Sequence, residues 1–254
     1  MASIIDSFND ALNEDKSYLK IVLYAIPVFV TARMFLVGSM SSFWFFASIF
    51  GLFFFGILTQ GINNVRLSKR EVLAINPVAI GLAIIKGLVV IVPYALVFGF
   101  VGYLLSTKVN IPIDFPHVQL IFAIVVWSIV FSLVMTAYLS FAKYLKIVQG
   151  YNFKVIFDSC VDVFLALLFF VPQFLIAVAV LVGPVWYLFT LFHVPLNHWG
   201  FVAYCSAAFV ASISIMANYF AQIAYEQIKG NNEDYDENCQ LNVIDDIAER
   251  MNGR

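Results

Sequence analysis

The sequence predicts an all-α integral membrane bundle of six transmembrane helices. Of its 254 residues, 62% are hydrophobic and 12% are charged. Soluble domains average roughly 45–50% apolar residues and about 25% charged residues. The apolar residues occur in continuous runs and not in period-two alternation, which favours helices over a transmembrane barrel. Because about 20 apolar residues cross the hydrocarbon core as a helix, we expect six spans, at 18–37, 42–60, 87–105, 118–138, 163–188 and 199–225.

The Lys and Arg residues predict which way the bundle faces, because loops rich in these residues stay in the cytoplasm. All 14 except Arg33 and Lys108 fall on one side of the predicted membrane. Lys86 is counted on that side because it precedes a span proline by seven residues, as Lys20 does. Arg33 lies near the outer end of its span, where it can reach the headgroups. We therefore expect a multi-pass protein of the plasma (inner) membrane, with both termini in the cytoplasm.

A weak internal repeat suggests how the spans are grouped. Each odd span contains a proline (Pro27, Pro93 and Pro172) and follows a short segment of mixed polarity. Such segments are typical of helices that lie in the membrane interface. We expect three hairpin-like pseudo-repeats, each made of a proline-containing span and a return span, with short interfacial amphipathic helices on the cytoplasmic side. The three segments are 4–12, 72–85 and 153–162.

The chain divides into three predicted parts. Residues 1–17 form a cytoplasmic interfacial helix, residues 18–228 the six-helix transmembrane domain, and residues 229–254 an acidic cytoplasmic tail. Within the tail, Ile244, Ile247 and Met251 have the spacing of a short amphipathic helix. Membrane lipids are the expected partners, and the tail could recruit a cytoplasmic protein. Its negative charge argues against nucleic-acid binding.

The even spans carry polar residues at a spacing of four, which places them on one face of each helix. Two interpretations are open. Small and polar residues let membrane helices approach closely and form hydrogen bonds with one another, and we favour this packing role. Alternatively, the polar faces line a cavity that opens toward the cytoplasm. The candidate ligand-binding residues are then Gln60, Asn64, Ser132, Thr136, Ser140, Asn218, Gln222 and Glu226.

Catalytic and metal-binding patterns are lacking. The sequence contains no G-x-S-x-G, no H-E-x-x-H and no Walker-type loop. His117, His193 and His198 fall in predicted outer loops, without the spacing of a metal signature. We therefore predict no catalytic residue, no metal and no cofactor, and a non-enzymatic protein is favoured over an enzyme.

Several stretches together resemble an uncharacterised bacterial and archaeal integral-membrane family, a domain of unknown function. The likeness covers nearly the whole chain up to Gly230. Where the family has a Leu-Pro pair before the third span, this chain has Asn76-Pro77. The family is distantly similar to the six-span domains fused to bacterial glycerophosphodiesterases, and it implies a plasma-membrane protein without a catalytic motif. The stretches are Asn13-Glu14-Asp15-Lys16, Asn63-Asn64-Val65-Arg66, Asn76-Pro77, Lys86-Gly87 and Ala221-Gln222-Ile223-Ala224-Tyr225.

Two functional hypotheses follow from these features. The first is non-enzymatic handling or transport of a small or lipid-like ligand through a cytoplasm-facing cavity. The alternative is a membrane-anchored interaction or assembly component, whose acidic tail and surface helices recruit a cytoplasmic partner.

Overall fold

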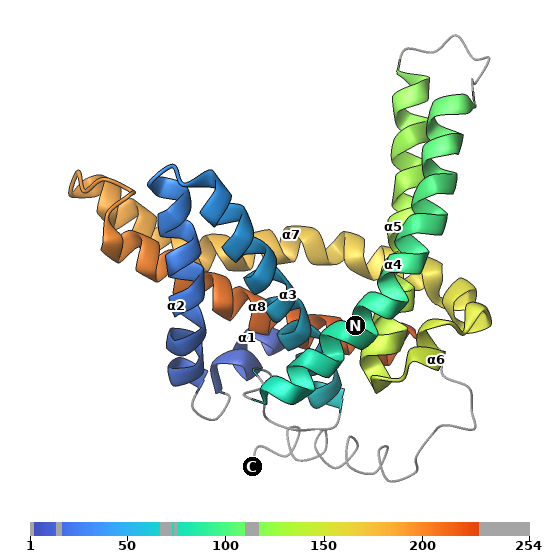
Figure 1. Cartoon of the computed structure of the whole chain (residues 1–254), viewed down its shortest axis with the longest axis horizontal. Coiled ribbons are helices and arrows are strands. Elements are labelled where there is room, and N and C mark those ends of the chain that lie inside the picture. The colour runs from blue at the N-terminus through green and yellow to red at the C-terminus, as the bar shows by residue number, and fades with distance from the viewer. Residues whose placement is uncertain (1–2, 14–16, 67–72, 74–75, 110–116, 229–254) are drawn as a thin grey trace.

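The computed structural model describes residues 3–13, 17–66, 73, 76–109 and 117–228, and within these ranges it is helical without any β-strand (Figure 1). Six of its helices are long and apolar enough to cross a membrane, namely α2, α3, α4, α5, α7 and α8. The predicted all-α membrane bundle of six spans is therefore confirmed. The helices are α1 (Ile4–Asn13), α2 (Ser17–Leu36), α3 (Met40–Arg66), α4 (Pro77–Lys108), α5 (Val118–Tyr144), α6 (Ile147–Gly150), α7 (Phe153–Leu191) and α8 (Trp199–Gln227).

Two spanning helices begin earlier than the sequence predicts. The side chain of Asn76 accepts hydrogen bonds from the N–H groups of Val78 and Ala79 at the start of α4, and Asn152 accepts one from Val155 at the start of α7. Both asparagines act as N-caps. The described part of the expected segment 72–85, and all of 153–162, are therefore continuous with the spans that follow. The 39 residues of α7 extend roughly 58 Å at about 1.5 Å per residue.

The span prolines lie inside continuous helices: Pro27 in α2, Pro93 in α4 and Pro172 in α7. The short helix α6 was not predicted. It follows Leu145, whose positive φ of 52° ends α5. A four-residue helix between two long apolar runs has too few residues to show a period in the sequence.

Helix α8 lies at the centre of the bundle. In its most apolar window 56% of the residues are buried, against 28% or fewer in the other five spanning helices. It packs against α1, α2, α3, α5 and α7. Its buried face is rich in alanine and serine, including Ala208, Ala211 and Ser212. Small side chains let neighbouring backbones approach closely where lipid removes the usual hydrophobic driving force.

The two ends of the bundle can be told apart without reference to a membrane. The connections between α2 and α3 and between α7 and α8 lie near each other, and we call this the hairpin end (Figure 1). Helix α1, the first turn of α2 and the last turn of α8 lie at the opposite end, which we call the α1 end. The α4–α5 hairpin stands to one side of the α2–α3 pair, with α7 crossing between them.

A close approach between α3 and α4 depends on Gly56. A Cβ atom added there would lie 2.7 Å from the Cγ2 atom of Ile80 and 2.9 Å from its carbonyl oxygen. Gly99 in α4, by contrast, has open space around its missing Cβ.

We expect Gly56→Ala to lower the free energy of unfolding by about 1–3 kcal/mol, because the backbone oxygen of Ile80 cannot move aside without shifting α4. The matched control Gly99→Ala should be neutral or slightly stabilising, since alanine is the better helix former. Thermal unfolding of the purified variants in detergent, followed by far-ultraviolet circular dichroism, measures both. An equal effect of the two substitutions would show that α3 and α4 are not in close contact.

Candidate functional site

The polar face of α5 joins that helix to α6 and α7. Ser132 donates a hydrogen bond to the carbonyl oxygen of Cys160 in α7 at 2.7 Å, and Ser140 donates one to that of Gln149 in α6 at 2.9 Å. Thr136 donates to the carbonyl of Ser132 within α5 at 2.7 Å. All three hydroxyl-bearing side chains are buried. These contacts support the packing interpretation for α5.

On α3, the predicted residues Gln60 and Asn64 contact each other. The amide Nε2 of Gln60 donates to Oδ1 of Asn64 at 3.2 Å, and Asn64 is buried. The neighbouring Asn63, which we did not single out, donates from Nδ2 to the carbonyl oxygen of Lys143 at 2.9 Å. It thereby connects α3 to the last turn of α5. The pair Asn63-Asn64 in the sequence was the available signal for this contact.

On α8, the predicted residues Asn218 and Gln222 bind α1. Gln222 accepts a hydrogen bond from the backbone N–H of Ser3 at 2.7 Å, and its Nε2 donates to Oγ of Ser7 at 3.0 Å. Asn218 donates to a carboxylate oxygen of Asp10 at 3.2 Å and accepts from Gln222 at 2.8 Å. Two polar side chains of α1, Ser7 and Asp10, therefore face α8, and the backbone N–H of Ser3 adds a third contact. Ser7 is fully buried between the two helices.

The last residue of this polar face, Glu226, is exposed. The eight predicted residues thus form separate groups: those of α5 toward α6 and α7, a pair on α3, and Asn218 and Gln222 of α8 against α1, with Glu226 exposed. The hydrogen bonds of the polar groups on α3, α5 and α8 are with other groups of the protein. Their role in ligand binding stays a prediction.

Lys143 is a buried cation at the α1 end that sequence reasoning counted only as a marker of orientation. Its Nζ atom donates to the carbonyl oxygen of Ile228 at 3.3 Å, and it lies 5.4 Å and 5.6 Å from the ring centroids of Tyr144 and Tyr225. The C-terminal end of a helix carries partial negative charge, which a cation stabilises. Lys143 therefore ties the end of α8 to α5.

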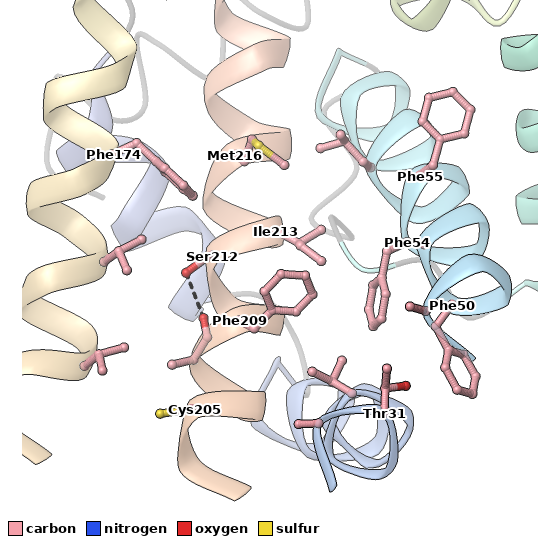
Figure 2. A pocket seen from close by; sticks show the side chains of 18 of the residues that line it. Thr31, Phe50, Phe54, Phe55, Phe174, Cys205, Phe209, Ser212, Ile213 and Met216 are labelled. Atoms are coloured by element: carbon pink, nitrogen blue, oxygen red, sulfur yellow. Dashed lines mark hydrogen bonds between the residues drawn. The ribbon is translucent and has the colours of Figure 1, made fainter. Parts of the chain in front are cut away.

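A hollow lies toward the hairpin end, among α2, α3, α7 and α8, and we call it the apolar groove. In Figure 2, α8 passes between α7 and α3, and Phe174, Met216, Phe54 and Phe50 surround the space. Its volume is about 860 Å³, within the range of roughly 300–1,000 Å³ typical of ligand pockets. The lining residues are Val28, Thr31, Ala32, Phe43, Ala47, Phe50, Gly51, Phe54, Phe55, Leu58, Phe174, Val178, Val182, Cys205, Ala208, Phe209, Ser212, Ile213 and Met216.

The groove presents almost no polar chemistry. None of its lining residues is charged. The hydroxyl of Thr31 donates to the carbonyl oxygen of Pro27 at 2.9 Å, and that of Ser212 donates to the carbonyl of Ala208 at 2.8 Å, so both are satisfied within their own helices. Cys205 contributes a free thiol. This surface can hold a hydrocarbon chain, and it provides no acid–base pair for catalysis.

None of the eight predicted residues lines the apolar groove, and sequence reasoning did not identify it. The α3 wall repeats every three or four positions, at Phe43, Ala47, Gly51, Phe54 and Leu58, which is one face of a helix. In a helix that is apolar all round, this periodicity does not stand out. The available signal was the small residues at 47 and 51 between phenylalanines, which leave room where a larger side chain would fill the space.

No metal site is evident in the part of the chain that the structure describes, where no three or more His, Cys, Asp or Glu residues come together. No protein-family model, curated protein or solved structure matches the chain. The likeness to the membrane family named above therefore stays a prediction, and function has to be argued from the geometry.

The contact between α1 and α8 gives a test of the polar network. In a Ser7→Cys variant, the thiol should be protected from alkylation, because Ser7 is fully buried. Adding Gln222→Leu removes the partner of both Ser3 and Ser7, and losing such bonds at a buried site costs about 1–3 kcal/mol. We expect alkylation to accelerate roughly five-fold or more.

Gln60→Leu is the matched control for this test, since the side chain of Gln60 donates its hydrogen bond to Asn64, within α3. It should leave the alkylation rate of the Ser7→Cys thiol unchanged. Equal rates in the Gln60→Leu and Gln222→Leu backgrounds would contradict the assignment of Gln222 as the anchor of α1.

Proposed function

We propose that this multi-pass membrane protein binds the hydrocarbon part of a lipid-like ligand in the apolar groove and holds it within the membrane, without making or breaking bonds. The observation that carries the proposal is the groove itself, an uncharged hollow of about 860 Å³ within the spanning helices. Both of its hydroxyl groups are satisfied internally, so an apolar occupant leaves no buried polar group without a partner.

The surroundings favour a hydrocarbon chain as the occupant. An empty hollow of this size forfeits the dispersion contacts of the atoms that line it, and the solvent around membrane helices consists of lipid chains. Phenylalanines from three helices, including Phe54 of α3, Phe174 of α7 and Phe209 of α8, give the groove a shaped aromatic surface. Phe209 lines the groove with 50% of its surface exposed. This exposure supports a groove that is open to its surroundings, where a hydrocarbon chain can enter.

The geometry supports holding a ligand more than conducting it across the membrane. Toward the α1 end the groove reaches Leu58 and Met216. Close to that level the rings of Phe55 and Tyr138 pack with their centroids 5.6 Å apart, and the Tyr138 hydroxyl lies 3.0 Å from that of Thr59. Helices α3 and α5 are thus in contact at the level where the groove ends toward the α1 end.

The groove lies elsewhere than the cavity that the sequence suggested. That cavity was expected at the cytoplasmic ends of the even spans, whereas the groove extends toward the hairpin end. The Lys and Arg distribution supports an orientation with the α1 end in the cytoplasm, and we propose the plasma membrane as the location. In that orientation the groove belongs to the outer half of the bilayer. The alternative function, recruitment of a partner by residues 229–254, concerns a segment outside the described residues.

The proposal predicts that filling the groove removes lipid binding. We expect Val178→Trp to reduce labelling several-fold when the protein, in lipid nanodiscs, is irradiated with a phospholipid that carries a diazirine on its acyl chain. Val178 lines the groove, and an indole there occupies space that a chain needs. Mass spectrometry of the labelled peptides from residues 205–216 measures the effect.

Ile176→Trp is the control, since Ile176 lies on the same helix with 65% of its surface exposed and does not line the groove. It should label like the unmodified protein. Labelling of residues 205–216 that is the same in both variants would contradict lipid binding in the groove.

A further inference from the structure

A single arginine lies at the hairpin end of the apolar groove. Arg33 follows Ala32, which lines the groove, and its Nη1 atom donates a hydrogen bond to the carbonyl oxygen of Asn197 at 3.2 Å. Asn197 belongs to the connection between α7 and α8. The guanidinium group therefore bridges from α2 to the connection that precedes α8.

The helices that build this end supply no carboxylate to neutralise Arg33. The sequence contains no Asp or Glu in residues 16–70, which cover α2 and α3, nor in residues 163–225, which cover the rest of the groove. The group that accepts the hydrogen bond of Arg33 is a neutral carbonyl oxygen. A guanidinium carries five N–H donors in a fork that matches phosphate or carboxylate, so its geometry favours an anion as a further partner.

The tryptophans at the hairpin end support a position of Arg33 at the depth of lipid headgroups. Trp44, Trp186 and Trp199 are all strongly exposed, and they lie at the ends of α3, α7 and α8 that meet at the hairpin end. Tryptophans of this kind are enriched at the membrane–water interface. The cation is thus placed where a headgroup would be, next to a groove suited to a chain.

His198 is a second hydrogen-bond donor near Arg33 in the sequence of contacts at this end. The Nδ1 atom of His198 accepts a hydrogen bond from the backbone N–H of Gly200 at 3.2 Å, so in the neutral imidazole the proton is on Nε2. His198 directly follows Asn197, whose carbonyl contacts Arg33. Along α8, the groove residue Cys205 is about 9 Å from the start of the helix at Trp199, at about 1.5 Å per residue.

We propose that the ligand of the groove is an anionic amphiphile, whose phosphate or carboxylate headgroup binds Arg33 while its hydrocarbon chain lies among α3, α7 and α8. This inference rests on the proposed function and adds the chemical class of the ligand. The hydrocarbon chain of the ligand contacts the uncharged surface of the groove. Its headgroup supplies a negative charge to Arg33, which residues 16–70 and 163–225 do not supply.

The test compares two photoactivatable probes with identical diazirine-bearing chains, a phosphatidic acid and a phosphatidylcholine, each at trace level in phosphatidylcholine nanodiscs. Labelling of residues 205–216 is quantified by mass spectrometry. For the unmodified protein we expect the phosphatidic acid to label about tenfold more, a ratio that corresponds to about 1.4 kcal/mol. Arg33→Gln should bring the ratio close to one without abolishing labelling, and Arg33→Lys should keep part of the preference as a point charge.

Lys108→Gln is the matched control, because Lys108 is an exposed cation at the end of α4, away from the groove. It should leave the ratio unchanged. Size-exclusion chromatography confirms that each variant is folded. Excess soluble glycerol phosphate should not displace the phosphatidic acid probe, and displacement would overturn the assignment to a lipid in favour of a free phosphate.

The outcomes separate this inference from the proposed function. If both probes label equally and Val178→Trp still removes the labelling, the groove binds hydrocarbon chains, and the preference for an anionic headgroup is refuted. An unchanged ratio in Arg33→Gln would likewise overturn the role of Arg33. If neither probe labels residues 205–216 in the unmodified protein, the proposed function itself fails.

Discussion

Helix packing around α8 is the constraint on which the rest of the structure depends. Between helices in lipid there is little hydrophobic gain, so association relies on close packing and hydrogen bonds. Helix α8 supplies both: small residues along its buried face, and Asn218 and Gln222 near its end. Helices α1, α2, α3, α5 and α7 all pack against it, and the apolar groove is the space left where α3 and α7 flank it (Figure 2).

The positions of the spanning helices could be predicted from the sequence because they depend on a strong local signal. Runs of about 20 apolar residues are dictated by the thickness of the membrane, and the predicted start of span six, at residue 199, is the first residue of α8. The starts of α4 and α7 could not be placed in the same way. There Asn76 and Asn152 cap the helices ahead of mixed segments, and polarity alone suggested separate surface helices.

The polar faces were visible in the sequence, but their partners were not. Spacing of four shows that Ser132 and Ser140 share a face, yet it cannot show that the face meets α6 and α7. The groove was harder to predict from the sequence, because its surface is apolar and the helices that form it are apolar on every side. A concave surface depends on how four helices diverge, which is a property of tertiary packing and not of any local pattern.

The hydrogen bond between Ser3 and Gln222 joins residues 219 positions apart, and this separation sets an order for assembly. Helix α1 is made before all six spanning helices, and its partner α8 is the last of those six to be made. At about 5–20 residues per second, synthesis of the intervening chain takes roughly 10–45 s. During that time Ser3, Ser7 and Asp10 have no α8 to bind. Docking of α1 is therefore a closing step of biogenesis, and it can take place only after the sixth span has entered the bilayer.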